Sequence, residues 1–511
     1  QLKRGDEENF AILTVPTNIP RLVRIPSEPE EFDFILIDEI ILEHIRKFFR
    51  GYQIKHTGLF RIMRDSELSV DEEEEGNILR AIQKEVKKRS RARVVSLQVV
   101  KGCSMELLSL FCQTIGFPQS EVTLIDGDLD LTYLFQLIEN VPRPDLCFPS
   151  YVPAKTYYED IFDFIKEGEF LLHVPYQSFY PTKDLLRAAA DDPDVLAIKM
   201  TLYRASEDSD IIQSLMRAVR NGKQVTVLVE VKARFDEERN IRWSEKLEDA
   251  GCHVIHGIVG MKIHSKIMLI IRREEGKIQR YIHLSTGNYN EKTARIYTDC
   301  GFFTANQDIA RDISDVFNVI TGYSVPTRWK RIMSSPYDMR EYFYELIDNE
   351  ITCQKKYKNG RIFAKMNSLE DTEIIQKLYQ ASRAGVRVQL VVRGICCLIP
   401  GVPGLSETIE VRSIVGRFLE HSRIYSFYNN GSTRVFLSSA DWMSRNFNRR
   451  IELMFEIIKE DSKEFLLDIL QACWRDNQKA RVLGPDRHYV KHRTKEDPFN
   501  QQEYFMRYYK S

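Results

Sequence analysis

Two histidines, His264 and His421, each begin the same four-residue pattern, His-Ser-(Lys or Arg)-Ile. An imidazole with a pKa of about 6.5 is largely neutral near neutral pH, so it can attack phosphorus without first losing a proton to a separate base. A single histidine at the start of a strand is more often a hydrogen-bonded core residue. Because the pattern occurs twice, we interpret the two histidines as catalytic residues and predict that His264 is a phosphate-accepting nucleophile.

Cations gather around both histidines and at the ends of the strands that we expect before them. In the first half these are Lys262, Lys266, Lys292 and Arg295, with Arg204, Lys232 and Arg234 at strand ends; in the second half they are Arg393, Arg417, Arg423 and Arg445. Strand ends in α/β units face the crevice where ligands bind, and a planar guanidinium matches phosphate oxygens two at a time. Pairing with a carboxylate such as Glu230, Asp236 or Glu237 is the alternative for any one arginine. Three arginines at equivalent strand ends favour phosphate.

Other phosphate-binding devices are missing from the sequence. Gly222-Lys223 and Gly276-Lys277 are followed by Gln and Ile, so neither is a Walker A loop, and the set of protein-kinase signatures is absent. A histidine intermediate is the remaining economical route to phosphoryl transfer.

The elements that must position these residues form a repeated strand-helix-strand unit. Apolar periodicity predicts strands at 195–200 and 224–230 around a helix at 210–220, and the same order recurs as strands at 361–366 and 387–393 around a helix at 373–383. Both copies carry a glycine, Gly222 or Gly385, where a left-handed helix cap is expected. Each histidine then opens an apolar strand, which a small polar cluster follows (285–288 and 438–441). We infer a duplicated α/β unit.

The chain has 511 residues, which is more than one hydrophobic core usually serves, and we expect three domains. We assign 1–150 to an α/β head domain (an α+β arrangement), with strands at 10–15, 59–62 and 94–100 and a helix at 77–87 after an acidic run at 71–75. Four prolines between 142 and 153 mark its end. The duplicated domains follow as 151–324 and 325–511.

Composition indicates an ordinary globular chain, with 43% hydrophobic and 29% charged residues and a net charge of -1. This balance excludes a chain that binds polyanions over its whole surface, and no apolar run approaches the roughly 18 residues of a membrane-spanning helix. Nine cysteines without a Cys-x-x-Cys pair indicate a reducing compartment, so we expect a cytoplasmic protein. No signal peptide precedes the chain, which begins at Gln1 and which we interpret as cut or incomplete there.

Several motifs together closely resemble the polyphosphate kinases, whose phosphohistidine domains are related to phospholipase D. They lie at 197–204, 231–238, 262–266, 286–299, 419–423 and 437–443. The resemblance covers residues 151–511, and 1–150 is similar to the less distinctive head domain of the family. It implies two duplicated phospholipase-D-like α/β domains. The family's N-terminal helical domain, with an asparagine that helps to bind nucleotide, has no counterpart here.

The resemblance also implies roles for individual residues. His264 matches the phosphorylated histidine, and His421 matches a second active-site histidine near the nucleotide phosphates. Tyr297 matches a position that stacks on the nucleotide and Arg393 one that pairs with its phosphates, and we add Lys266 and Arg423 to the nucleotide site.

Arg204 and Arg234 match positions that the family associates with Mg²⁺. Because a guanidinium has no lone pair to donate to a cation, we expect these two arginines to hold the phosphate that the ion bridges.

The predicted activity is the reversible transfer of the ATP γ-phosphate to inorganic polyphosphate, with ATP, ADP, polyphosphate and Mg²⁺ as partners and no nucleic acid. We expect a homo-oligomer, either a dimer or a tetramer, and leave peripheral membrane association and the preferred direction open.

Two alternatives are weighed. A phospholipase-D-like phosphodiesterase or nuclease requires His-x-Lys-x4-Asp, but Ile271 and Tyr428 occupy the aspartate positions and Arg423 replaces the second lysine. A non-enzymatic polyanion-binding scaffold would leave the paired histidines unexplained.

Overall fold

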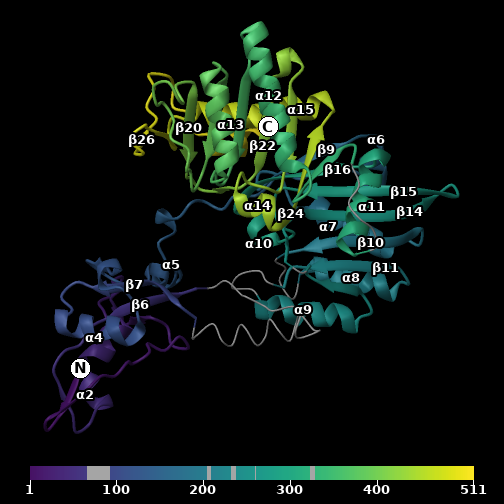
Figure 1. Ribbon diagram of the computed structural model, residues 1–511. Coiled ribbons are helices and arrows are strands. Elements are labelled where there is room, and N and C mark those ends of the chain that lie inside the picture. Colours follow the sequence, from purple (N-terminus) through teal and green to yellow (C-terminus); the bar gives the residue numbers. More distant parts are fainter. Residues whose placement is uncertain (66–91, 204–208, 232–236, 259, 323–328, 511) are drawn as a thin grey trace. The chain divides into compact units, whose positions relative to one another are not determined.

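The structure is a computed structural model of residues 1–511, and it describes all of them except 66–91, 204–208, 232–236, 259, 323–328 and 511 (Figure 1). The described residues divide into two compact units, one of those between 1 and 150 and one of those between 151 and 511. The acidic run and the helix predicted at 71–87 lie outside the described residues, as does the predicted division at 324–325. The limits of the three domains therefore stay predictions.

The first unit contains a small sheet with the strand order β6-β7-β8. The strands predicted at 59–62 and 94–100 are confirmed as β6 (Phe60–Arg64) and β7 (Val94–Val100), and β8 (Thr123–Ile125) runs parallel to β7. Helix α4 (Met105–Ile115) buries Phe111 against this sheet, with its ring centroid 4.1 Å from that of Phe60. The other elements of the unit are β1 (Leu2–Arg4), β2 (Glu7–Asn9), β3 (Leu22–Arg24), β4 (Phe34–Leu36), α1 (Ile37–Glu43), α2 (Ile45–Phe48), β5 (Gln53–Ile54) and α5 (Leu134–Asn140).

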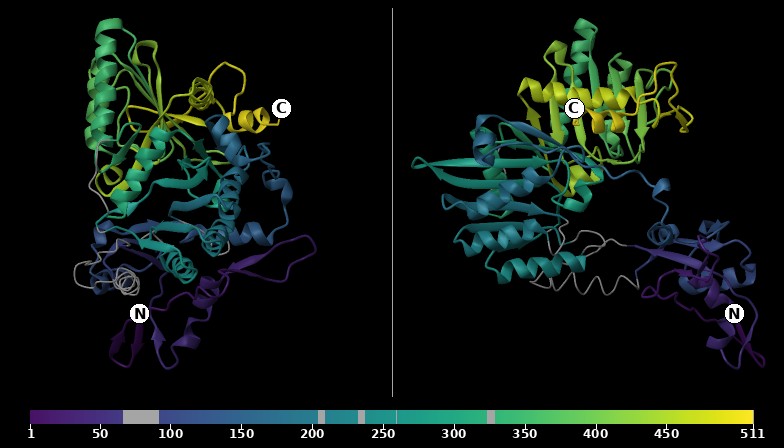
Figure 2. Two further views of the ribbon diagram at one scale, coloured as in Figure 1. Left: turned by 90° about the vertical axis from the view of Figure 1, so that its right-hand side faces the viewer. Right: turned by 180° about the vertical axis from the view of Figure 1, so that it is seen from behind.

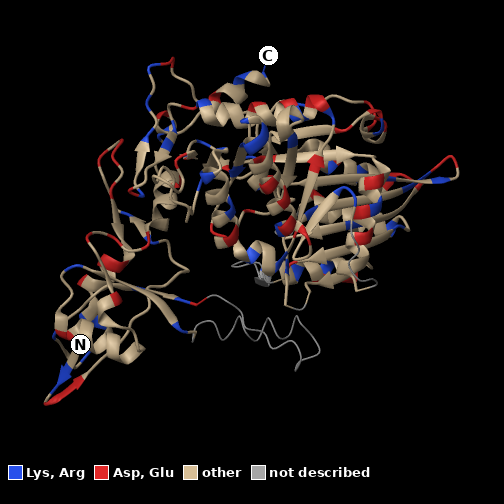
Figure 3. Ribbon diagram, turned by 45° about the horizontal axis from the view of Figure 1, so that its top comes forward, with Lys and Arg blue, Asp and Glu red and all other residues tan. Residues whose placement is uncertain are grey.

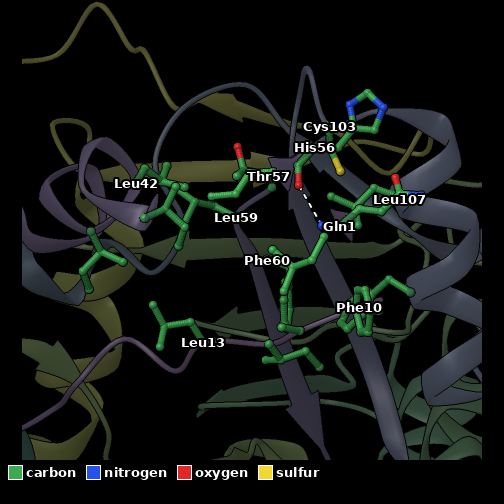
Figure 4. Close-up of a pocket in the computed structure, with 18 of the residues that line it drawn as sticks. Gln1, Phe10, Leu13, Leu42, His56, Thr57, Leu59, Phe60, Cys103 and Leu107 are labelled. Carbon is green, nitrogen blue, oxygen red and sulfur yellow. Dashed lines mark hydrogen bonds between the residues drawn. The ribbon is translucent and has the colours of Figure 1, made fainter. Parts of the chain in front are cut away.

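The strand predicted at 10–15 is wrong. Strand β2 ends at Asn9, and residues 10–15 are not in a strand. Figure 4 shows why the segment is apolar: Phe10 and Leu13 point into a cavity that Leu42, Phe60 and Leu107 also line, with a volume of about 110 Å³. The apolar side chains of this segment therefore line a cavity, and its backbone pairs with no strand among the residues that the structure describes.

The predicted duplication is confirmed in the second unit. The first copy is β10 (Val195–Leu202), α8 (Asp210–Arg220) and β11 (Gln224–Val229); the second is β18 (Arg361–Met366), α13 (Thr372–Arg383) and β19 (Arg387–Val392). The two strands of each copy pair in parallel. Ser209 caps α8 and Asp371 caps α13, each by accepting a backbone N–H three residues on. Gly222 and Gly385 have φ of 80° and 88°, as the expected left-handed caps require. The fold is of the predicted mixed α/β class.

Each copy builds one sheet, and each sheet includes a short strand from the other half of the chain. The first sheet has the order β12 (His253–His256), β11, β10, β14 (Lys266–Glu274), β15 (Lys277–Ser285), β16 (Tyr297–Thr304) and β21 (Leu419–Glu420), and β9 (Phe170–Val174) also pairs with β16. The second has the order β13 (Lys262–Ile263), β24 (Arg450–Ile457), β23 (Arg434–Ser438), β22 (Arg423–Phe427), β18, β19, β20 (Ile409–Ile414), β25 (Ala480–Leu483) and β26 (Tyr489–Lys491), and β17 (Ile332–Ser335) pairs with β24. Strands β13 and β21 are thus exchanged between the halves.

Helices cover the sheets on both faces. Those of the first half, besides α8, are α6 (Ile161–Glu167), α7 (Tyr180–Asp191), α9 (Glu237–Asp249), α10 (Glu291–Ala294) and α11 (Gln307–Ile320). Those of the second half, besides α13, are α12 (Met339–Tyr357), α14 (Ser444–Asn448), α15 (Glu460–Arg475) and α16 (Gln501–Tyr508). In Figures 1 and 2, α12 and α15 lie on opposite faces of the second sheet.

One hydrophobic core is shared by the two halves. It joins residues of β14, β15 and β16 to residues of β22, β23, β24 and α15. The rings of Phe302 and Phe455, one from each half, stack with centroids 5.4 Å apart. Since the two sheets bury their apolar surface against each other, neither half is expected to keep its core alone. Among the described residues, no helix has the length and apolarity to cross a membrane.

Two buried histidines of the first sheet predict how stability depends on pH. His173 and His283 are 2% and 1% exposed, and burial lowers the pKa of each to about 3. In the unfolded chain an imidazole has a pKa of about 6.5, so below that pH it binds a proton. In the folded chain His173 and His283 stay unprotonated until the pH falls to about 3. The contribution of these two neutral histidines to the free energy of unfolding is fully present above a pH of about 6.5. Below that pH it decreases by about 1.4 kcal/mol for each histidine with every unit by which the pH is lowered.

We predict that His173→Phe, which keeps a ring against Tyr176 and Phe505, reduces this loss. Between pH 7 and pH 5 the variant should lose about 2 kcal/mol less unfolding free energy than the wild type. Urea unfolding at the two pH values measures it, with the exposed His488→Gln as control. An equal loss in His173→Phe and wild type would contradict the assignment.

Candidate active site

The exchanged strands place each histidine beside the opposite half. In β13, Ile263 pairs with Ile451 of β24, and in β21, Glu420 pairs with Thr298 of β16. After each short strand the chain turns into its own sheet, through β14 or β22. His264 and His421 occupy these two turns, so each imidazole is held between a strand of one half and a strand of the other.

His264 is oriented by a buried carboxylate of the second half. Its Nδ1 lies 2.8 and 3.0 Å from the two carboxylate oxygens of Glu452, which is fully buried. The hydroxyl of Ser439 donates a further hydrogen bond of 2.5 Å to the same carboxylate. We assign the proton of the ring to Nδ1, because both nearby oxygens are acceptors. This leaves Nε2 with a lone pair.

His421 repeats the arrangement with the halves interchanged. Its Nδ1 lies 2.9 and 2.8 Å from the carboxylate oxygens of Asp299, which comes from the first half. Thr286 donates a hydrogen bond of 2.6 Å to Asp299, as Ser439 does to Glu452. The side chains of His264 and His421 remain 12% and 13% exposed. The Nδ1 edge of each ring is therefore fixed by a carboxylate, and at His421 Nη1 of Arg423 also lies 3.3 Å from Nε2.

The electrostatic setting keeps the nucleophile neutral. Burial, with the nearby charges of Lys266 and Arg450, lowers the pKa of His264 well below its ordinary value. Burial also raises the pKa of Glu452 to about 7, which makes its carboxylate a stronger acceptor for the Nδ1 proton. Burial acts in the same direction at Asp299, but the hydrogen bond and charge of His421 and the charge of Arg423 outweigh it and hold the pKa of this carboxyl below its ordinary value. An ionised aspartate therefore supports His421.

Two buried cations lie behind the histidines, at equivalent positions of the two copies. Lys266 donates to the carbonyl oxygen of His264, and Arg423 donates to that of His421 at 2.8 Å. Arg423 also donates to Asp441 at 3.1 Å. Burial lowers the pKa of Lys266 to about 7. These contacts join the cations to the loops that carry the imidazoles.

The strand that precedes His421 is fixed by a buried charge network. Glu420 accepts from Lys365 Nζ at 3.0 Å and from the side-chain amides of Gln501 and Gln502 at 2.6 Å each. The carboxylate and the ammonium are both nearly inaccessible to water, so each needs the other and the added hydrogen bonds. Helix α16, at the end of the chain, thereby stabilises the position of His421.

The structure brings Tyr297 and Arg393 to the second histidine. The ring centroids of Tyr297 and His421 are 5.1 Å apart. Arg393 follows β19 and donates from Nε to the carbonyl oxygen of Glu420 at 2.9 Å and from Nη2 to Asn367 at 2.8 Å. Its guanidinium is therefore held beside the site. Tyr203 lies beside His264 as Tyr297 lies beside His421, and the ring centroids of Tyr203 and His264 are 5.2 Å apart.

The other cations of the sequence prediction fall into two groups. Arg204, Lys232 and Arg234 lie outside the described residues. The others lie on or next to the elements of the site: Lys262 on β13, Lys292 on α10, Arg295 directly after it, Arg445 on α14, and Arg417 with its guanidinium 5.3 Å from the ring centroid of Phe418. The roles of all of them stay predictions.

Sequence reasoning missed the two orienting acids. Asp299 ends the motif at 286–299, which predicts no role for it, and Glu452 lies outside all of the motifs. A signal was present, because Thr286 precedes Asp299 by 13 residues and Ser439 precedes Glu452 by 13 residues. Alignment of the two copies beyond the small polar clusters would have found both acids.

Within the described parts of the chain, no group of three or more His, Cys, Asp or Glu side chains could hold a metal ion. The acids nearest the histidines are already bound to protein donors. A metal ion at this site would need ligands other than these side chains, and Mg²⁺ commonly takes waters and phosphate oxygens.

The comparisons with known proteins agree over the whole chain. Residues 1–137 match a family model described as the polyphosphate kinase middle domain, and residues 160–326 and 332–502 match polyphosphate kinase C-terminal domains 1 and 2. A polyphosphate kinase of Lactiplantibacillus plantarum is 46% identical over 495 residues, which cover 96% of this chain and 69% of that protein. One of Bacillus anthracis is 46% identical over 497 residues, covering 95% and 71%.

A solved structure is similar as well. The crystal structure of polyphosphate kinase from Porphyromonas gingivalis superposes with a TM-score of 0.84 at 33% identity, covering 100% of this chain and 76% of that one. The fold and the paired histidines thus define an enzyme built from a duplicated α/β unit. The chain belongs to the polyphosphate kinase family, and the predicted resemblance is confirmed.

The contact between His264 and Glu452 predicts the effect of a single substitution. Glu452→Gln keeps the shape and the bond from Ser439 but presents an amide that no longer holds the Nδ1 proton as a carboxylate does. Loss of an orienting carboxylate lowers turnover by about 10²- to 10⁴-fold in comparable sites, and we expect a fall in that range. Steady-state kcat with ATP measures it.

The matched control is Glu456→Gln on the same strand, where the carboxylate pairs with Arg434 away from the histidines. It should leave kcat within about twofold of the wild-type value, as surface substitutions usually do. Equal activity in the Glu452 and Glu456 variants would show that Glu452 does not orient the nucleophile.

Proposed function

We propose that the chain transfers the γ-phosphoryl group of ATP to inorganic polyphosphate, reversibly, through a phosphohistidine on His264. The observation that carries the proposal is the pair of imidazoles whose Nδ1 atoms are both occupied by buried carboxylates of the opposite half. Each ring is left with Nε2 as its reactive nitrogen. Family membership gives the substrate class, and the geometry gives the residue.

In the first half-reaction, Nε2 of His264 attacks the γ-phosphorus of ATP. A P–N bond forms as the bond from that phosphorus to the bridging oxygen breaks, and ADP leaves with the electron pair. The imidazole gains positive charge as it attacks, and Glu452 stabilises that charge through the Nδ1 proton. No separate base is needed, because the low pKa of His264 keeps the ring neutral beforehand.

In the second half-reaction, a terminal oxygen of polyphosphate attacks the phosphohistidine and the P–N bond breaks. The chain grows by one phosphate, and the reverse sequence regenerates ATP from ADP. Charge spreads over the phosphoryl oxygens in such a transfer, and fixed cations stabilise it. We assign this role to Lys266 and Arg423, and we assign to His421 the steadying or protonation of the leaving oxygen.

We assign the nucleotide to the side of the site formed by His421. Tyr297 would stack on the adenine, and Arg393 would pair with the nucleotide phosphates through the part of its guanidinium that faces away from Asn367. We further propose that Mg²⁺ is bound through substrate phosphates, which Arg204 and Arg234 would hold. Bound there, the ion would neutralise phosphate charge. A cytoplasmic location and a homo-oligomeric state remain part of this proposal.

A phosphodiesterase of the phospholipase D type is the second candidate, since it too would use paired histidines. The positions that should hold its aspartates are Ile271, on β14, and Tyr428, directly after β22. Neither side chain can fix a lysine as a carboxylate would. Release of product from a phosphodiester substrate, without ATP, would favour this candidate. A scaffold that only binds polyanions would bind polyphosphate without consuming ATP.

The nucleophile can be tested by labelling. Wild-type protein incubated with Mg²⁺ and ATP labelled in its γ-phosphate should form an adduct that is lost in acid and kept in base. His264→Ala should form none, because it lacks the accepting nitrogen. His421→Ala should form the adduct more slowly and still on His264.

The control is His256→Ala, at a histidine of the first half that pairs with the exposed Glu248. It should label at the wild-type rate. An acid-labile adduct of normal yield in His264→Ala would rule out the assignment of the nucleophile.

A further inference from the structure

Charge on this chain is mixed at large scale and clustered only locally. Figure 3 shows Lys and Arg interspersed with Asp and Glu over both units. One cavity differs: it opens at the edge of the second sheet, has a volume of about 470 Å³, and is lined by basic side chains without any carboxylate. Its polar lining includes Arg393, Ser413, Lys479, Arg481, Tyr489 and Lys491.

The basic residues of this cavity form a row across the sheet. Ser413 of β20 is opposite Arg481 of β25, and Arg481 is opposite Lys491 of β26. Residues that are directly opposite in antiparallel strands place their side chains on the same face, with neighbouring strands about 4.8 Å apart. The row therefore runs from β20 to the edge strand β26. We call it the edge row.

The edge row contains a pairing that is unfavourable by itself. Arg481 and Lys491 carry like charges at directly opposite positions, which destabilises a strand pair. Neither residue has a carboxylate partner among the residues that the structure describes, and nor does Lys479, which enters the same cavity. By contrast Arg412, the neighbour of Ser413, is paired with Glu410. The positive charge of Arg412, beside the edge row, is therefore neutralised by a carboxylate, whereas no described carboxylate neutralises the charges of Arg481 and Lys491 in the row.

The edge row is continuous with the active site. The hydroxyl of Ser413 donates to the carbonyl oxygen of Arg393 at 3.0 Å, and the Arg393 guanidinium donates to the backbone of Glu420, the residue before His421. Strands β18, β19 and β20 run parallel, so Arg393 and Ser413 lie at the same, carboxyl, edge of the sheet. A ligand held at Arg393 can therefore extend along the row.

We propose that the edge row binds the polyphosphate chain several phosphates away from the phosphate that reacts. A linear polyanion with a charge on every unit is the ligand that a row of unpaired cations fits, and bound phosphates would relieve the repulsion between Arg481 and Lys491. The row thereby gives the enzyme a preference for long chains over short ones. This inference rests on the proposed function, since it takes polyphosphate as the substrate.

The test is the double variant Arg481→Gln/Lys491→Gln in the direction that makes ATP from ADP. We expect the KM for long-chain polyphosphate to rise roughly tenfold, with a much smaller change in the KM for tripolyphosphate, which has few phosphates to spare for the row. The dependence of log KM on log salt for long chains should weaken by about one to two units.

Two further variants guard against loss of fold. Arg481→Lys/Lys491→Arg keeps both charges and should keep the wild-type KM for long chains. Lys355→Gln/Arg383→Gln removes one lysine and one arginine from exposed helix ends elsewhere, and it should have no effect on either KM.

The outcomes separate the two proposals. An unchanged KM for long chains in Arg481→Gln/Lys491→Gln, or an equal rise for tripolyphosphate, overturns the inference and leaves the proposed function standing. Slower phosphoenzyme formation from ATP in that variant would assign the cavity to the nucleotide and also overturn it. Wild-type protein that makes neither phosphoenzyme nor ATP would fail the proposed function itself.

Discussion

The active site depends on one constraint: each half of the duplicated unit contributes a short strand to the sheet of the other. Pairing of β13 with β24 and of β21 with β16 brings His264 to Glu452 and His421 to Asp299. Neither imidazole takes its orienting carboxylate from its own half. The shared core, in which Phe302 stacks on Phe455, makes this exchange rigid. The reactive geometry is therefore a property of the assembled pair of domains.

This arrangement explains how so much charge can be buried near the histidines. Isolated buried charges are costly, and a buried pair is tolerated when hydrogen bonds satisfy what the partner leaves open. Glu420 meets that condition through Lys365 and two glutamine amides. Arg423 meets it at both terminal nitrogens, through Asp441 and a backbone carbonyl, while its buried Nε has no hydrogen-bond partner in the described parts of the structure. The low-dielectric surroundings that make burial costly also strengthen the interaction of fixed cations with a transferring phosphoryl group. The same burial keeps His264 neutral and ready to attack.

The sequence predicted what repeats locally, and it failed where position depends on distant pairing. The strand-helix-strand units and both glycine caps follow from apolar periodicity and from the needs of a left-handed turn. The strand predicted at 10–15 failed because its apolar side chains cover a cavity, and periodicity cannot distinguish that from a sheet. Glu452 lies 188 residues from His264 in the chain, and only the exchange of β13 brings them together. The residues next to the histidines in sequence therefore predict a role in phosphoryl transfer. They do not predict which carboxylates orient the two imidazoles.

The most direct test of the exchanged-carboxylate account is the identity of the phosphorylated nitrogen. If Glu452 holds the proton on Nδ1, the phosphoryl group must bond to Nε2 of His264. The phosphoenzyme can be trapped with ATP, digested in base, and its phosphohistidine isomer identified by ³¹P NMR against both standards. The account predicts the Nε2 isomer alone. Phosphate on Nδ1 would mean that the carboxylate does not occupy that nitrogen during catalysis, and it would contradict the central claim.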